Sequence, residues 1–172
     1  ESAVVPNAAG VRTLEIGSGC SSGLVGLVCR ACGGSVLATD WRSVVVDGLQ
    51  TRFGQLDRFD AKVLDWTIDA ELDAETFELI IAADLLCDQG TICGPKVISE
   101  RLKRTSGARA LLLQQLQADG ACAIAIAELR HRGLRLAAFQ VCLGREMVEV
   151  SPDMLPQAGT LLLLVVTWGL IN

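Results

Sequence analysis

The stretch Thr13-Leu14-Glu15-Ile16-Gly17-Ser18-Gly19-Cys20-Ser21-Ser22-Gly23-Leu24-Val25-Gly26-Leu27 decides the fold of this chain. It predicts a buried strand, a glycine-rich turn and the start of an apolar helix. Glycines let the backbone turn sharply and let a ligand approach where a Cβ would collide. The helix behind the turn offers free N–H groups to a carboxylate or a phosphate. The pattern therefore predicts a ligand site at the junction of strand and helix.

Glu15, two residues before the first glycine, indicates which kind of ligand the turn accepts. A carboxylate beside the turn would repel a pyrophosphate, but it favours a cationic ligand through charge-assisted hydrogen bonds. S-adenosylmethionine carries a sulfonium and an ammonium group, so it fits this turn better than a dinucleotide does.

Composition and charge narrow the classes of protein. The chain has 172 residues, enough for one domain over residues 1–172 with a substantial core, and 51% of its residues are hydrophobic. Its net charge of −5 and the lack of a lysine or arginine run disfavour nucleic acid as the main partner. The run Leu161-Leu162-Leu163-Leu164-Val165-Val166 is a core strand, because a bilayer span needs about 20 apolar residues.

The cysteines indicate an intracellular protein. Seven cysteines are an odd number, and no secretory signal pattern opens the chain, so we expect reduced thiols. Cys29 and Cys32 have the spacing of metal ligands, but there is no second such pair, and His131 is the only histidine. We therefore expect no metal, and a location in the cytoplasm with the nucleus as the alternative.

Apolar strands alternate with helical stretches, as in a parallel sheet covered on both faces. Gly94-Pro95 is interpreted as a helix start and Gly133 as a helix end. A loop with a short hairpin strand is expected between Gly144 and Gly159, and an acidic turn at Thr67–Thr76. The expected strands are Arg12–Ile16, Val36–Thr39, Ala61–Leu64, Phe77–Ala82, Ala108–Gln114, Leu134–Val141 and Leu161–Thr167; the expected helices are Ser22–Cys32, Val44–Gly54, Pro95–Arg104 and Gln117–Arg132.

Polar residues follow four successive strands at the point where each strand ends. The first strand leads into the glycine turn, the second into Asp40, the third into Asp65-Trp66 and the fourth into Asp84. In an open α/β sheet the ligand binds at the carboxyl ends of the strands, where the strand order reverses. Asp40 is placed to accept the ribose hydroxyls of a nucleoside, and Asp65-Trp66 to meet the adenine ring. Asp84 is placed to orient a substrate amine.

These residues resemble a known family. The elements Leu-Glu-Ile-Gly-Ser-Gly, Ala-Thr-Asp, Val-Leu-Asp-Trp and Ile-Ile-Ala-Ala-Asp-Leu-Leu are similar to those of the class I, seven-stranded methyltransferases, over about residues 11–143. The Leu-Asp-Trp element and Asp84 narrow the resemblance to the eukaryotic lysine methyltransferase-like group. The resemblance implies a Rossmann-like, doubly wound α/β sheet of seven strands, mostly parallel with an antiparallel last strand. It also implies methyl transfer from S-adenosylmethionine to a protein lysine.

The resemblance also assigns residues to the site. Asp84 would be catalytic, as the first residue of the family's Asp-x-x-Tyr substrate motif. The tyrosine position of that motif is Cys87 here, a doubtful catalytic assignment. The residues assigned to S-adenosylmethionine, from the resemblance and from the strand ends together, are Glu15, Gly17, Ser18, Gly19, Gly23, Asp40, Trp41, Asp65, Trp66 and Ala83.

The chain departs from the family pattern at three places, which leaves other functions open. Cys20-Ser21-Ser22 lengthens the glycine turn by two residues, Cys87 lacks an aromatic ring, and we expect the family's upstream tryptophan-bearing segment to be missing. The alternatives are a methyltransferase acting on a small molecule or on another side chain, and a silent cofactor-binding module. A nicotinamide-dependent oxidoreductase is disfavoured, because Ser22 occupies the third glycine position of its motif.

Overall fold

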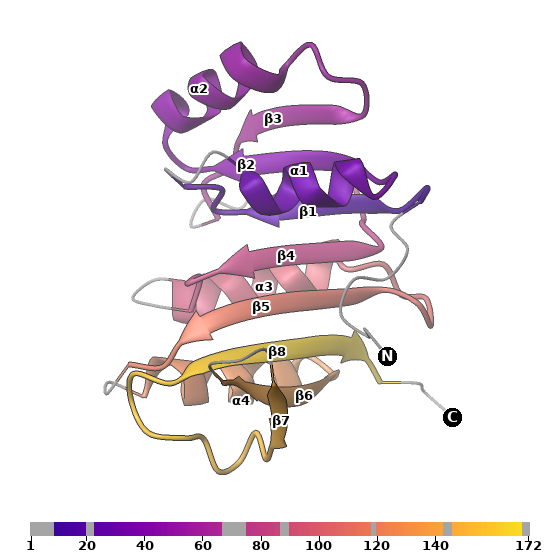
Figure 1. Cartoon of the computed structure of the whole chain (residues 1–172). Coiled ribbons are helices and arrows are strands. Elements are labelled where there is room, and N and C mark those ends of the chain that lie inside the picture. The colour runs from indigo at the N-terminus through magenta and orange to yellow at the C-terminus, as the bar shows by residue number, and fades with distance from the viewer. Residues whose placement is uncertain are drawn as a thin grey trace.

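In the computed structural model the chain forms one eight-stranded sheet with helices on both faces (Figure 1). The structure describes residues 9–19, 23–66, 75–86, 90–117, 120–142 and 146–169. The elements are β1 Arg12–Ile16, α1 Leu24–Ala31, β2 Ser35–Asp40, α2 Ser43–Phe53, β3 Phe59–Val63, β4 Leu79–Ala83, α3 Gly90–Arg101, β5 Arg109–Gln115, α4 Ala121–His131, β6 Leu134–Val141, β7 Met147–Val150 and β8 Leu161–Trp168.

The strand order is β3-β2-β1-β4-β5-β8-β6-β7. Strands β1 to β5 pair in parallel, whereas β8 runs antiparallel to both β5 and β6. The chain therefore winds outward in both directions from β1 and β4, which places the reversal of strand order between these two strands. The expected doubly wound α/β sheet is confirmed, with eight strands rather than seven. The additional strand is β7, which forms a hairpin with β6 in the region where a short hairpin strand was expected.

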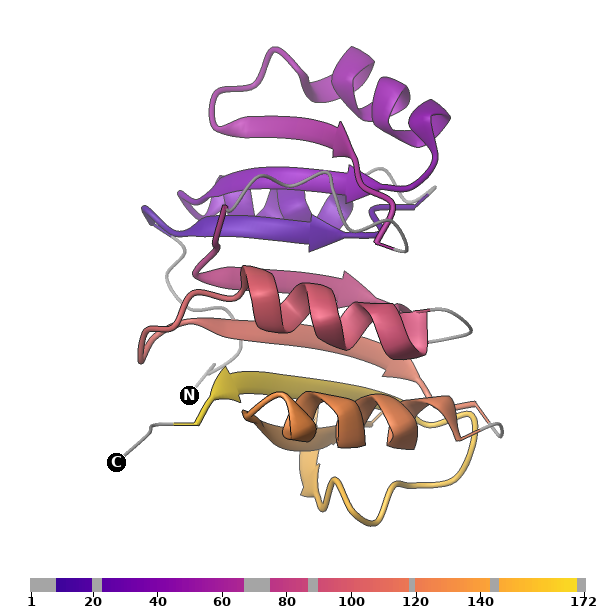
Figure 2. The same cartoon turned by 180° about the vertical axis from the view of Figure 1, so that it is seen from behind.

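Helices cover the two faces of the sheet unequally. Seen from behind, α3 and α4 lie side by side across β4, β5, β8 and β6 (Figure 2). On the other face, α1 and α2 pack on β1, β2 and β3. Two apolar clusters result, one on each face; Leu14, Ile80 and Leu112 belong to the first, and Val36, Leu49 and Ile81 to the second.

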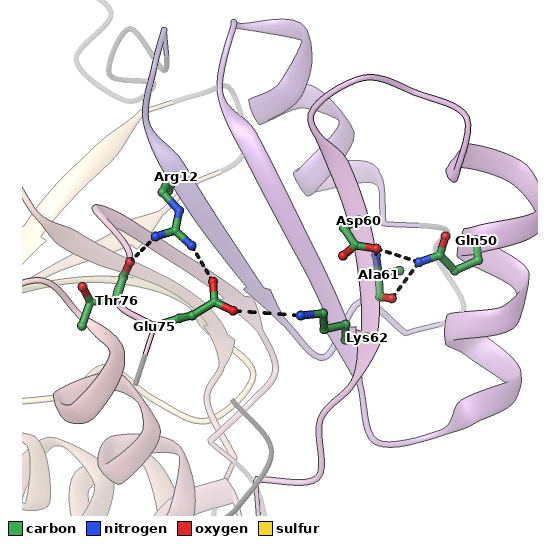
Figure 3. A network of polar contacts seen from close by, with 7 residues as sticks. All are labelled: Arg12, Gln50, Asp60, Ala61, Lys62, Glu75 and Thr76. Carbon is green, nitrogen blue, oxygen red and sulfur yellow. Dashed lines mark hydrogen bonds and ion pairs between the residues drawn. The ribbon is translucent and has the colours of Figure 1, made fainter. Parts of the chain in front are cut away.

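A polar network joins the segment before β4 to side chains on β1 and β3 (Figure 3). The Arg12 guanidinium donates to the Glu75 carboxylate and to the Thr76 carbonyl, and the Lys62 ammonium lies 4.0 Å from Glu75. On β3, the Gln50 amide donates to the Ala61 carbonyl at 2.8 Å, which joins α2 to the sheet edge. These bonds link side chains of β1, β3 and α2, whose strands are held in register by backbone pairing.

Two helix starts differ from the sequence-based expectation. Helix α3 begins at Gly90, so Pro95 lies inside it and the Gly94-Pro95 start was wrong. It also ends at Arg101 rather than at the expected Arg104. Gly94 is buried, and a Cβ added to it would lie 3.2 Å from the Leu85 side chain. This close packing keeps the segment before Pro95 helical. Helix α4 begins at Ala121 rather than Gln117, because Gly120 is left-handed with φ of 76°.

The remaining elements agree with their expected bounds to within two residues. Most of the acidic turn at Thr67–Thr76, residues 67–74, lies outside the described residues. Among the helices that the structure describes, none is long and apolar enough to cross a membrane.

Candidate cofactor and substrate site

The glycine turn and the three strand-end acids lie at one edge of the sheet. Strands β1 to β4 run parallel, so their arrowheads point the same way in Figure 1. The turn follows β1, Asp40 ends β2, Asp65 follows β3 and Asp84 follows β4. These ends flank the point where the strand order reverses, which is where open α/β sheets bind ligands.

The glycine turn depends on left-handed backbone. Gly17 has φ of 71°, Gly19 of 59° and Gly23 of 63°, conformations that a residue with a Cβ adopts at a cost. The Ser18 N–H donates to the Thr39 carbonyl at 2.8 Å, so the turn folds over the end of β2. Cys20, Ser21 and Ser22, the expected insertion, lie outside the described residues.

Asp40 fastens this turn to β2. Its Oδ2 accepts the Gly19 N–H at 2.8 Å, and its Oδ1 accepts the Arg42 backbone N–H at 3.0 Å and Nε at 3.1 Å. The residue is 2% exposed. Burial alone would raise the pKa of Asp40, but the hydrogen bonds from Arg42 and Gly19 outweigh it and hold the pKa below its ordinary value. The carboxylate is therefore ionised at neutral pH; Oδ2 accepts one bond and keeps a lone pair for a further donor, whereas Oδ1 already accepts two.

Glu15 points into the protein, beneath the first turns of α1. Its Oε2 accepts the Ser18 hydroxyl at 3.1 Å, and its carboxylate also accepts the Gly26 N–H. The approach is so close that a Cβ on Gly26 would lie 2.7 Å from Oε2. Burial raises the pKa of Glu15, against the opposing effect of these two hydrogen bonds. Its role toward a cationic ligand stays a prediction, whereas its contacts make it a support of the turn.

The two tryptophans near the turn have different surroundings. Trp66 packs beside Gly17, whose added Cβ would lie 3.8 Å from the Trp66 ring. Trp66 and Asp65 are brought there by β3, since the Leu64 N–H donates to the Asp40 carbonyl at 3.0 Å. Trp41 is 57% exposed, with the Arg42 guanidinium 5.8 Å from its ring centroid.

Asp84 has a strained backbone and a held side chain. Its φ is 49°, which is uncommon for a residue with a side chain. Its N–H donates to the Leu113 carbonyl at 2.9 Å, and its Oδ1 accepts the Gln115 N–H at 3.0 Å. Ala83 precedes it at the exposed end of β4, and Cys87 lies outside the described residues.

Gln114 is a buried polar residue that the sequence analysis did not assign to the site. It is 2% exposed; its Oε1 accepts the Leu86 N–H at 2.9 Å, and its Nε2 lies 3.5 Å from Asp84 Oδ1. It thereby joins β5 to Asp84 and Leu86, at the start of the segment that follows β4. Its signal in the sequence was a glutamine at the end of an otherwise apolar strand. Arg42, which holds Asp40, was missed as well.

A cavity of about 400 Å³ adjoins the turn. Glu15, Gly17, Ser18 and Ala83 form one part of its wall. Most of the rest is apolar and comes from α1, β4, β5 and β8, on the face that α1 and α2 leave partly open. The other assigned residues do not line it; Gly19, Gly23, Asp40, Trp41, Asp65, Trp66 and Asp84 lie outside its wall.

Histidine, cysteine, aspartate and glutamate are the side chains that could hold a metal ion in the described part of the chain. Within that part of the chain, no group of three or more histidine, cysteine, aspartate or glutamate side chains is arranged to hold a metal ion. Cys29 is buried and Cys32 is exposed, and both are free thiols.

Comparison with known proteins gives a family match. A family model described as lysine methyltransferase matches residues 3–106, more than half of the chain. The matched range contains the glycine turn, Asp40, Trp66 and Asp84. No curated protein matches the chain.

Solved structures share the fold at low sequence identity. Ribosomal protein L11 methylase from Lactobacillus delbrueckii subsp. bulgaricus has a TM-score of 0.63 and 16% identity, covering 97% of this chain and 72% of that chain. A chain from the complex between the Haloferax volcanii Trm112 methyltransferase activator and a methyltransferase has a TM-score of 0.70 and 15% identity, covering 97% and 87%. MtNAS, solved with S-adenosylmethionine, has a TM-score of 0.59 and 18% identity, covering 94% and 56%.

Proposed function

Because the chain belongs to the lysine methyltransferase family, we propose that it transfers a methyl group from S-adenosylmethionine to the side-chain amine of a protein lysine. Membership makes it a methyltransferase that uses S-adenosylmethionine, the cofactor that Glu15 and the glycine turn predicted. The proposal of a protein lysine as acceptor is carried by the family match, which includes both the turn and Asp84.

The strand ends supply groups that suit this cofactor. Asp40 is an ionised acceptor next to the turn, suited to the ribose hydroxyls. Trp66 presents an apolar ring beside Gly17, where an adenine would pack. Gly17 and Gly19 leave the backbone uncovered by side chains, so a ligand can approach closely. When bound, S-adenosylmethionine supplies a methyl group on a positively charged sulfur.

Asp84 is the residue we assign to the acceptor amine. It follows directly after β4, which pairs with β1, and the Gln115 N–H fixes the position of its carboxylate. Accepting a hydrogen bond from the amine would aim the nitrogen lone pair away from Asp84 and toward the methyl group. Holding the two reacting groups in line is the main contribution that such a site makes to the rate.

Ligand binding and a transfer assay test the proposal in turn. Calorimetry is expected to show binding of S-adenosylhomocysteine and no binding of NAD; the reverse result would refute the cofactor assignment. Transfer of a radiolabelled methyl group from S-adenosylmethionine to lysate proteins, followed by mass spectrometry, is expected to find methyl-lysine.

Two variants of Asp84 separate chemistry from structure. Asp84→Asn keeps an acceptor oxygen for the Gln115 N–H, so we expect it to fold and to bind S-adenosylhomocysteine but to lose at least about tenfold in transfer. Asp153→Asn, on an exposed segment, is the matched control and is expected to keep full activity. Full transfer by Asp84→Asn and Asp84→Ala would remove Asp84 from the reaction.

A small molecule is the second candidate acceptor, because the apolar cavity of about 400 Å³ reaches Gly17 and Ser18. Cavities of this size and composition are typical of small-ligand sites. The lysate assay distinguishes the two: label in the fraction of small molecules, with none on protein, would favour this candidate over lysine.

A further inference from the structure

Positive charge gathers at the amino ends of the strands, opposite the candidate site. Residues 101–109 and 130–135 contain seven of the fifteen lysines and arginines and neither aspartate nor glutamate. Both segments lead from the end of a helix into the start of a strand, α3 into β5 and α4 into β6. Of these seven, Lys103, Arg130 and Arg132 are paired with acids from other segments. The cations that matter for an anion are therefore those without such a partner.

A cavity of about 430 Å³ lies between these segments, and we name it the amino-edge cavity. The polar side chains on its wall come from Arg104, Thr105, Ser106, Arg135, Thr167 and Trp168. All of them carry hydrogen-bond donors, and none of the described residues lining the cavity is acidic. The wall is therefore suited to a ligand that only accepts hydrogen bonds.

Arg104 and Arg135 lack an acidic partner, whereas seven other cations of the described residues have one. In the described part of the protein, no hydrogen bond or ion pair joins either guanidinium to another residue. Most other basic side chains are satisfied, as Arg12 is by Glu75 in Figure 3. The pairs are Arg12–Glu75, Arg42–Asp40, Arg58–Asp57, Lys62–Glu75, Lys103–Glu78, Arg130–Asp153 and Arg132–Glu128.

Trp168 positions one of these guanidinium groups. Its indole N–H donates to the Leu102 carbonyl at 3.0 Å, which fixes the ring, and Arg104 stacks over that ring at 4.4 Å from the centroid. Arg135 lies on β6, where its backbone pairs with that of Thr167 on β8, so it faces the same cavity from a strand. A guanidinium group that is already stacked, as that of Arg104 is, loses less conformational entropy on binding than a free one would.

We propose that the amino-edge cavity binds a phosphate monoester dianion through Arg104 and Arg135. Each guanidinium can donate two parallel hydrogen bonds to phosphate oxygens, and the hydroxyls on the wall can donate to the remaining ones. The dianion is favoured over a single carboxylate because two positive groups face one cavity. A neighbouring cavity of about 590 Å³ includes Glu100, and its Lys103 and Arg132 are already paired, so it is less suited to an anion.

The ligand is a single phosphate group rather than a polyanion, since only two unpaired guanidinium groups are among the described residues that line the cavity. The phosphate belongs either to a modified side chain of another protein or to a free small molecule. The site lies at the opposite end of the strands from the glycine turn, so the proposal does not depend on the methyltransferase function.

Calorimetric titration of inorganic phosphate into the whole chain tests the site, at constant ionic strength and at mildly alkaline pH. We expect one saturable site in the wild type. Arg104→Gln and Arg135→Gln are each expected to weaken it about tenfold or more, the usual worth of a hydrogen bond to a charged group. Arg130→Gln, which removes a paired arginine on α4, is the matched control and should bind like the wild type.

If Arg104→Gln unfolds, Arg135→Gln still tests the site, because the guanidinium stacked on the Trp168 ring is that of Arg104. A serine-phosphorylated peptide and AMP then identify the source of the phosphate, each compared with its unphosphorylated form. Preference for either supports the site. Absent phosphate binding, equal binding by the variants, or binding of an oligonucleotide alone would overturn the proposal.

Discussion

The substitution Gly26→Ala in α1 tests whether the buried Glu15 carboxylate supports the glycine turn. A Cβ there would lie 2.7 Å from Glu15 Oε2 and 2.9 Å from Val36 Cγ1, both closer than atoms tolerate in a packed core. Both neighbours are buried, so neither can move aside into solvent. Gly26→Ala must therefore displace the Glu15 carboxylate, the β2 side chain or the helix itself.

The two opposing effects of this substitution can be compared. Overpacking a core costs about 1–3 kcal/mol. Displacing the carboxylate weakens its hydrogen bond to the Gly26 N–H, worth about 1 kcal/mol or more. Alanine gains about 1 kcal/mol over glycine inside a helix. We expect the free energy of unfolding to fall by about 1–3 kcal/mol, from the sum of these terms.

Gly48→Ala in α2 is the matched control. An added Cβ there would meet only the end of the flexible Arg52 side chain, at 3.3 Å. We expect that variant to gain about 0.5–1 kcal/mol from helix propensity. Urea denaturation followed by circular dichroism measures both variants, and calorimetry with S-adenosylhomocysteine should show weaker binding by Gly26→Ala. If Gly26→Ala is as stable as Gly48→Ala, the carboxylate does not lie beneath α1.

Three further variants test the buried polar groups of the site. The raised pKa of Glu15 stabilises the fold only at acidic pH, so Glu15→Gln should match the wild type near pH 4 and become the more stable of the two toward neutral pH in urea denaturation. The lowered pKa of Asp40 acts oppositely: Asp40→Asn should lose about 1–3 kcal/mol at neutral pH, a loss that shrinks as the pH falls below about 4, and it should bind S-adenosylhomocysteine more weakly. Gln114→Leu leaves the Leu86 N–H without its acceptor and should lower the free energy of unfolding by about 1–3 kcal/mol. In that variant kcat should fall more than the affinity for S-adenosylhomocysteine. An unchanged kcat would contradict a role of Gln114 in holding Asp84.

Most of the sheet could be predicted because its strands are continuous apolar runs separated by glycine and acidic turns. Arg12–Ile16 and Leu134–Val141 were placed to the residue, and each strand-end acid lies at the edge where the parallel topology puts it. Strand β7 lacks such a signal: it is a short edge strand, and its pairing with β6 decides its conformation. The start of α3 was missed because burial of Gly94 outweighs the local preference of Pro95.

The residues that hold the site together were harder to find than the residues at its surface. Arg42 is two positions from Asp40, but only the geometry of the strand end brings its guanidinium back onto the carboxylate. Gln114 and Leu86 are 28 positions apart and meet because β4 and β5 are neighbours. Partners of this kind depend on tertiary contacts, which periodicity and spacing do not encode.

The acids of the candidate site serve its architecture before any ligand arrives. Asp40 accepts the Gly19 N–H, Asp84 accepts the Gln115 N–H and Glu15 accepts the Gly26 N–H. Each carboxylate thus uses part of its acceptor capacity on the backbone, so its position is fixed before a ligand binds. Alanine at any of these positions removes the support along with the contact, so loss of activity in an alanine variant would not identify a ligand-binding residue. The amide variants keep the acceptor oxygen and remove the charge, which is why they separate the two roles.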